Sequence, residues 1–200
     1  MVFNLDLDFM NTDDLIFHKT AMMKGGYSLD NKDFQGLKRW YGILFQLTSA
    51  KHYLNMLMCQ ETIFGDLKNI YEGMALFSSF VLQYSKCFTS AGEGLAKLDA
   101  KQVFASSEND FKSHKRILEI RNNLIAHNGK IDLVLVSQGV KEQEDRFLVK
   151  HFITFSVPMN ELSSFEVALD MATSHSIRAI NKNLDSIGKK LGKIVLFDEI

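Results

Sequence analysis

The sequence predicts a mainly α-helical fold, an up-and-down bundle of four to five helices with a β-hairpin inserted before the last long helix. Apolar residues recur at helical spacing through most of the first 128 positions. A short section rich in β-branched residues follows, and a helical pattern then returns over 161–191. The length of 200 residues fits an N-terminal arm at 1–34 and a single helical domain at 35–200.

The first two helices are predicted by two apolar stripes. Residues 1–34 have a mixed composition with the pair Gly25-Gly26, which is typical of an irregular arm. From about residue 34 to residue 58, and again over 67–88, apolar side chains follow a helical repeat. A glycine-rich segment at 91–94 should end the second helix.

The next helices are predicted from the residues that favour helix starts and ends. A shorter helix is expected over 95–104. Ser107 can then cap a new helix, with Asp110 placed three positions later like the acid of a capping box. This helix should end at Asn128-Gly129, since an asparagine–glycine pair favours the C-terminal end of a helix.

The hairpin is expected at about 131–157. Residues 131–136 and 149–157 have the alternation and the β-branched content of strands, with a polar loop from Gly139 to Asp145 between them. The last helix should run over 161–191 and stop at Gly192, leaving a strand-like tail at 193–200.

Composition limits the classes of function. The formal net charge of -1 gives no strong overall field for nucleic acid, so any RNA contact must come from a local patch. Cys59 and Cys87 lie far apart, which favours reduced thiols in an intracellular protein. There is no basic leader and no apolar run of about 18 residues, so we expect a cytoplasmic protein without a membrane partner.

The helix after Ser107 carries the most informative residues. On a helical wheel Arg121 falls near the middle of an apolar face, and His127 lies at the edge of that face. A guanidinium keeps its charge there and must find hydrogen-bond acceptors. The apolar face itself consists of Ile117, Leu118, Ile120, Leu124 and Ile125.

The segment from Arg121 to His127 resembles the Arg-polar-x(4)-His signature of the HEPN superfamily. The segment from Tyr84 to Phe88 resembles a Tyr-x-(Lys/Arg)-x-Phe feature of such chains. The resemblance covers about 35–190 and implies a small helical domain. It implies a metal-independent endoribonuclease of toxin–antitoxin, abortive-infection or antiviral defence systems, acting as a homodimer with a composite cleft.

The resemblance also implies roles for single residues. His127 would act as general acid–base, Arg121 would stabilise the phosphate in the transition state, and Asn122 would position it. RNA is the implied substrate, an antitoxin or another defence protein is a candidate partner, and no metal or cofactor is expected. The candidate RNA-binding side chains are His114, Lys115, Arg116, Asn128 and Lys130.

A second interpretation stays open. The chain can be a non-catalytic helical module that binds RNA, a nucleotide or a protein partner through the same cleft. Arg121 can serve only to bridge a carboxylate such as Glu72, and His127 can cap its own helix. His114 can be a partly buried structural residue. The inserted hairpin departs from a minimal helical bundle.

Overall fold

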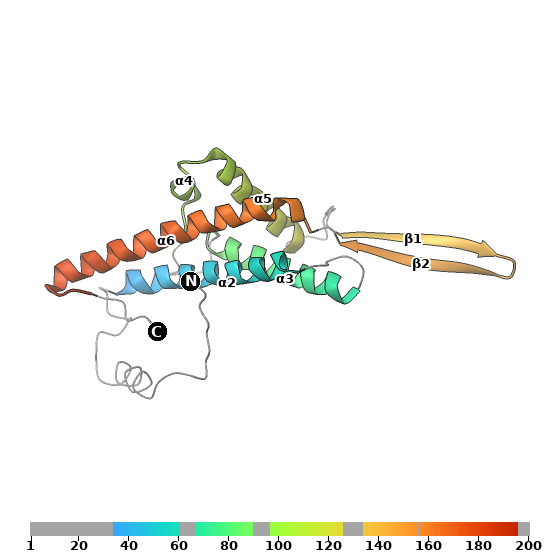
Figure 1. Ribbon diagram of the computed structural model, residues 1–200, viewed down its shortest axis with the longest axis horizontal. Helices are drawn as coiled ribbons and strands as arrows, with labels where there is room; N and C mark the ends of the chain where they lie inside the picture. Colours follow the sequence, from blue (N-terminus) through green and yellow to red (C-terminus); the bar gives the residue numbers. More distant parts are fainter. Residues whose placement is uncertain (1–33, 61–66, 90–96, 126–133, 156, 196–200) are drawn as a thin grey trace, which may run out of the picture. The chain divides into compact units, whose positions relative to one another are not determined.

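The computed structural model describes residues 34–60, 67–89, 97–125, 134–155 and 157–195 (Figure 1). The described residues are mainly helical, with an antiparallel hairpin before the last long helix, which confirms the expected fold class. The chain divides into two compact units: one holds Gly42–Ala179, and the other holds the residues before and after that span. The expected arm lies almost entirely outside the described residues.

Within the described residues the helices begin and end close to the positions that the sequence predicts, and the expected helix end at Asn128-Gly129 lies outside these residues. The shorter helix is an exception, because among residues 97–104 only Ala100–Val103 is helical. Asp99 sets this start, since its side chain accepts a hydrogen bond of 2.9 Å from the backbone N–H of Lys101. The helices are α2 (Gln35–Met58), α3 (Leu67–Lys86), α4 (Ala100–Val103), α5 (Glu108–Ile125) and α6 (Leu162–Leu191), with a 3-10 turn η2 (Met159–Glu161) before α6.

Aromatic side chains form the centre of the Gly42–Ala179 unit. Phe80 of α3 stacks on Phe165 of α6, with 6.1 Å between ring centroids. Phe77 and Tyr84 of α3 are also fully buried. Each such side chain contributes roughly 1.5–3 kcal/mol by leaving water, so these contacts join α3 firmly to its neighbours.

The unit formed by the two ends of the chain has its own packing. Leu37 of α2 and Ile187 of α6 are buried. A Cβ at Gly188 would lie 2.8 Å from the backbone oxygen of Lys193, so glycine allows the chain to return against the end of α6. Gly192 ends that helix with φ 64°, as the sequence predicts. Residues 193–195 form no strand, and the rest of the expected tail lies outside the described residues.

The hairpin consists of β1 (Val134–Gln143) and β2 (Arg146–Phe155), paired antiparallel from Val134 opposite Phe155 to Gln143 opposite Arg146. The expected loop from Gly139 to Asp145 was too long, because the turn consists of Glu144 and Asp145 alone. The end of β1 is exposed to solvent on both faces, and its residues are mostly polar. It therefore lacks the alternation of apolar and polar residues that marks a half-buried strand.

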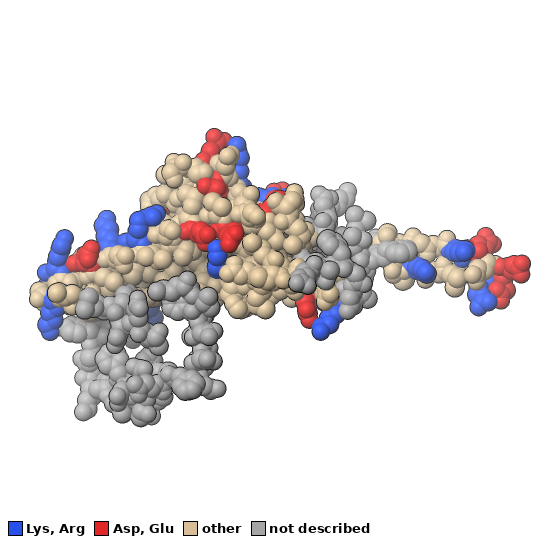
Figure 2. All heavy atoms as spheres, viewed as in Figure 1, with Lys and Arg blue, Asp and Glu red and all other residues tan. Residues whose placement is uncertain are grey.

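Charged side chains of both signs are spread over the helices on the face shown in Figure 2, and along the hairpin they gather toward the turn. None of the helices in the described ranges carries a stretch long and apolar enough to cross a membrane.

Candidate functional site

The candidate site lies on α5, and its first turn is fixed by a cap. The hydroxyl of Ser107 accepts a hydrogen bond of 3.3 Å from the backbone N–H of Asp110, which confirms the expected capping residue. Glu108 and Asp110 place negative charge in the first turn, where the helix dipole favours it. The start of the helix is therefore specified locally by its own sequence.

The middle of α5 is held by His114. This side chain is only 3% exposed, and its Nδ1 lies 3.0 Å from the hydroxyl oxygen of Tyr84 on α3. Burial, and then the charge of Lys115, lowers the pKa of His114 to about 4. The imidazole is therefore neutral near pH 7, and its Nδ1 can accept a hydrogen bond from the hydroxyl of Tyr84. Burial also raises the pKa of Tyr84 well above its ordinary value.

Three phenylalanine rings complete the surroundings of His114. The ring centroids of Phe88, Phe104 and Phe111 lie 4.3, 5.0 and 6.0 Å from the centroid of the imidazole. Tyr84 and Phe88, the ends of the Tyr-x-(Lys/Arg)-x-Phe segment, thus meet at one buried histidine. The structure places His114 in the core, so we remove it from the candidate RNA-binding side chains.

The next two cations on α5 have neighbours of different kinds. Lys115 is exposed, and its Nζ lies 4.4 Å from the centroid of the Phe111 ring. Arg116 donates hydrogen bonds of 3.1 Å to Glu119 of its own helix and to Glu161 of η2. The bond to Glu161 is the main reason that the pKa of Arg116 is raised. Arg116 therefore joins two segments of the fold, whereas Lys115 keeps its charge in solvent.

Arg121 lies near the end of α5 and is half-buried, beside the exposed Asn122. Its Nη1 donates a hydrogen bond of 3.0 Å to Oδ1 of Asn122. In the described part of the chain Arg121 has no carboxylate within ion-pair distance. The Glu72 carboxylate, one partner considered from the sequence, lies 3.8 Å from Lys68 instead.

With respect to the residues that the structure describes, the Arg121–Asn122 pair leaves most of the guanidinium available. A guanidinium has five N–H donors, and the amide oxygen of Asn122 takes one of them without neutralising the charge. Such a group can bind a phosphate with two parallel hydrogen bonds. His127, Asn128 and Lys130 lie outside the described residues, so the structure describes two of the three expected catalytic residues, Arg121 and Asn122.

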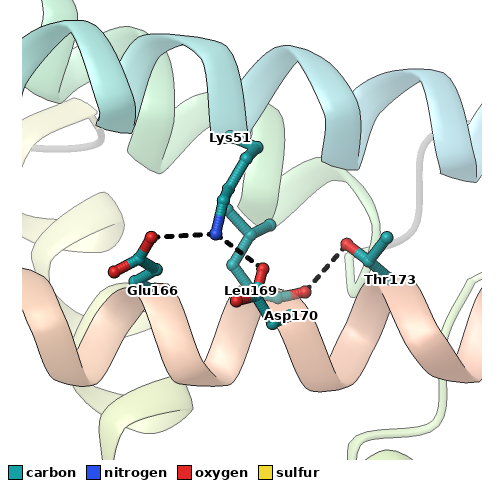
Figure 3. Close-up of polar contacts among 5 residues, drawn as sticks. All are labelled: Lys51, Glu166, Leu169, Asp170 and Thr173. Atoms are coloured by element: carbon teal, nitrogen blue, oxygen red, sulfur yellow. Dashed lines mark hydrogen bonds and ion pairs between the residues drawn. The ribbon is translucent and has the colours of Figure 1, made fainter. Parts of the chain in front are cut away.

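One cluster that the sequence did not indicate joins α2 to α6 (Figure 3). Nζ of Lys51 lies 2.9 Å from Glu166 and 2.7 Å from Asp170, one turn apart on α6. Burial opposes the charge of Lys51, but the hydrogen bonds to Asp170 and Glu166 outweigh it and raise the pKa of the amine. The partners are more than 100 residues apart, so no local pattern could have indicated them.

Asp170 also borders an open hollow of about 410 Å³. The hollow is lined by Val103 and Ser106 near α4 and by Val167, Asp170, Met171, Ser174 and Arg178 of α6. Arg121 is not among these residues, so the hollow is separate from the candidate site. No group of three or more metal-ligating side chains is present among the residues that the structure describes.

Comparison of the chain with protein-family models, curated proteins and solved structures finds no match.

Proposed function

We propose that this protein is a HEPN-like, metal-independent endoribonuclease in which Arg121, Asn122 and His127 act on one RNA phosphate. The observation that carries the proposal is the difference between two arginines of α5. Arg116 contacts two carboxylates, whereas the one hydrogen bond of Arg121 to another described residue, five positions further along, goes to the neutral amide of Asn122. An arginine without a carboxylate partner on a packed helix is a suitable phosphate ligand.

The proposed reaction is an internal transesterification. His127 takes the proton of the ribose 2′-OH, whose oxygen attacks the adjacent phosphorus while the bond to the 5′-oxygen breaks. The leaving 5′-oxygen takes a proton from water, and His127 releases its own proton to the solvent, so the products are a 2′,3′-cyclic phosphate and a 5′-hydroxyl. Arg121 stabilises the charge that develops on the phosphoryl oxygens, and its bond to Asn122 holds the guanidinium in place.

In this proposal, other side chains of α5 and of the residues after it extend the site along the RNA. Lys115 is exposed on the same helix, and Asn128 and Lys130 follow close after it in sequence. Phosphate contacts of this kind position a nucleic acid without reading its bases. In this proposal a second copy of the chain completes the cleft, and an antitoxin or another defence protein restrains the activity in a cytoplasmic setting.

The test is cleavage of total cellular RNA by the purified protein in excess EDTA. Wild-type protein and Arg116→Ala should cut, His127→Ala should not, and Arg121→Ala should cut far more slowly, with all four folded by circular dichroism. Cleavage products should carry a cyclic phosphate. Cleavage that persists in His127→Ala would falsify the assignment.

The second candidate is the non-catalytic binding module, which the same charge on Arg121 favours. It predicts saturable RNA binding without turnover, and weaker binding in Arg121→Ala. If all four proteins bind RNA without cutting it, and only Arg121→Ala binds weakly, the binding module replaces the ribonuclease.

A further inference from the structure

The hairpin presents two chemically different faces. In an antiparallel pair, residues directly opposite one another lie on the same face, and alternate residues along each strand share it. Over residues 137–151 the register therefore groups six side chains on what we call the apolar face: the cross-strand pairs Gln138–His151, Val140–Val149 and Glu142–Phe147. The opposite face carries Lys141 and Lys150 around Leu148.

The apolar face is open to solvent. Val140 is 63%, Phe147 is 65% and Val149 is 52% exposed. Its remaining members, Gln138, Glu142 and His151, are exposed too. A hairpin of two strands is marginally stable by itself in water, and it usually needs another layer on its apolar side. The described part of the chain supplies none over residues 137–151, which makes this face a candidate interaction surface.

We propose that the apolar face packs against the same face of a second copy of this chain, with the two hairpins antiparallel. A two-fold axis that crosses the strands at the Val140–Val149 pair reverses the strand direction and stacks each strand on its own copy. Val140 then lies over the partner's Val140, and Val149 over the partner's Val149. The centre of the contact is thereby made of four valines.

The flanking positions complement one another in the same arrangement. The axis places Phe147 against the partner's His151, so that two rings meet on each side of the centre. It places Glu142 against the partner's Gln138. The Gln138 amide donates one N–H to His151 at 3.1 Å, and its second N–H remains free to donate to a carboxylate.

The alternative arrangement fits poorly. If both hairpins pointed the same way, Glu142 would lie over the partner's Phe147, and burial of a carboxylate against a ring without a donor is costly. The antiparallel form avoids this contact and gives the Glu142 carboxylate a hydrogen-bond donor. The polar pattern of the face therefore favours a second copy in that one orientation.

The contact is small. A stable interface usually takes about 20–30 residues from each side, and the apolar face supplies six. We therefore expect a reversible dimer whose population rises with protein concentration. The inference does not depend on the proposed ribonuclease activity, because it involves none of the residues assigned to RNA.

The experiment is sedimentation equilibrium of the full chain over a wide range of concentration, with a matched pair of variants. Phe147→Asp changes the apolar face, whereas Leu148→Asp changes the adjacent residue, which is 41% exposed on the opposite face. Wild type and Leu148→Asp should dimerise with similar dissociation constants. Phe147→Asp should weaken the dimer at least tenfold, and Val149→Lys provides a second variant if that protein does not fold.

Orientation is tested with single cysteines in a Cys59→Ser background, which removes the exposed native thiol. A short bismaleimide should join Val149→Cys to its copy and should not join Leu148→Cys. A monomeric wild type, equal weakening by Phe147→Asp and Leu148→Asp, or equal cross-linking of the two cysteines overturns the proposal. A dimer in which the two hairpins pair edge to edge would show equal weakening by the two variants or equal cross-linking of the two cysteines.

Discussion

The charged and polar side chains in the two parts of α5 have different kinds of hydrogen-bond partner. Between Ser107 and Arg116, three polar side chains have structural partners. Ser107 caps the helix, His114 bonds to the Tyr84 hydroxyl, and Arg116 bonds to two carboxylates. At the end of the helix, Arg121 has a neutral amide instead of a carboxylate. One helix thus holds a segment that stabilises the fold and a segment with charge available for a ligand.

The largest expected effect concerns activity at the end of α5. If Arg121 stabilises the transition state, Arg121→Ala should lower kcat for RNA cleavage by about 10²–10³-fold, as loss of a comparable donor does in other active sites. Its free energy of unfolding should change by no more than about 0.5 kcal/mol, because within the described ranges the side chain bonds only to Asn122, which is exposed. Cleavage kinetics and urea denaturation measure the two effects. If Arg121→Ala does not fold, Arg121 stabilises the structure, as the residues earlier in α5 do.

The largest effect on stability should come from the middle of α5. His114→Ala leaves a cavity among three phenylalanine rings and removes the partner of the buried Tyr84 hydroxyl. We expect a loss of about 2–4 kcal/mol in urea denaturation. Phe111→Leu keeps most of the volume and serves as the milder control. If His114→Ala lowers the free energy of unfolding by less than Phe111→Leu does, the buried histidine does not stabilise the fold.

The pH dependence of stability provides a third comparison. Burial lowers the pKa of His114 in the folded state to about 4, below its ordinary value of 6.5, so the unfolded chain binds this proton more readily. The stabilising contribution is fully present above about pH 6.5 and is lost as the pH falls toward 4. Thermal unfolding of wild type should therefore shift more over this interval than that of His114→Gln, which cannot titrate. Parallel curves for the two proteins would argue against a neutral buried imidazole.

The smallest effect is expected at Arg116. Its ion pairs are partly exposed, so Arg116→Ala should cost about 0.2–1 kcal/mol, and the cost should shrink at high salt. RNA cleavage per folded molecule should stay close to that of wild type. Thermal melts at two salt concentrations measure the first effect, and a strong loss of cleavage would place Arg116 in the site.

Much of the fold could be predicted because its signals are local. The apolar repeats indicated α2, α3, α5 and α6, and the Ser107 cap and the Gly192 end follow from short-range chemistry. The hairpin was located by its β-branched residues, but the length of β1 was underestimated. Lys141, Glu142 and Gln143 are exposed on a strand without a half-buried alternation, so their sequence resembles that of a loop.

The site was predicted less well, because its decisive contacts join distant segments. The contact between Tyr84 and His114 spans 30 residues, and it turns a residue that resembled a phosphate ligand into part of the core. The partners of Arg116 and Lys51 likewise depend on how helices pack. A helical wheel placed Arg121 on the apolar face, but only the structure shows that its partner is an amide.

The most direct measurement of the central claim is the salt dependence of RNA binding in a His127→Ala background, which prevents cleavage. Arg121→Ala should weaken binding and lower the slope of log affinity against log salt by about 0.7, the value for one lost contact to single-stranded phosphate. Arg116→Ala should leave both the affinity and the slope unchanged. Equal effects of the two substitutions would contradict the claim that Arg121 is the phosphate-binding arginine of α5.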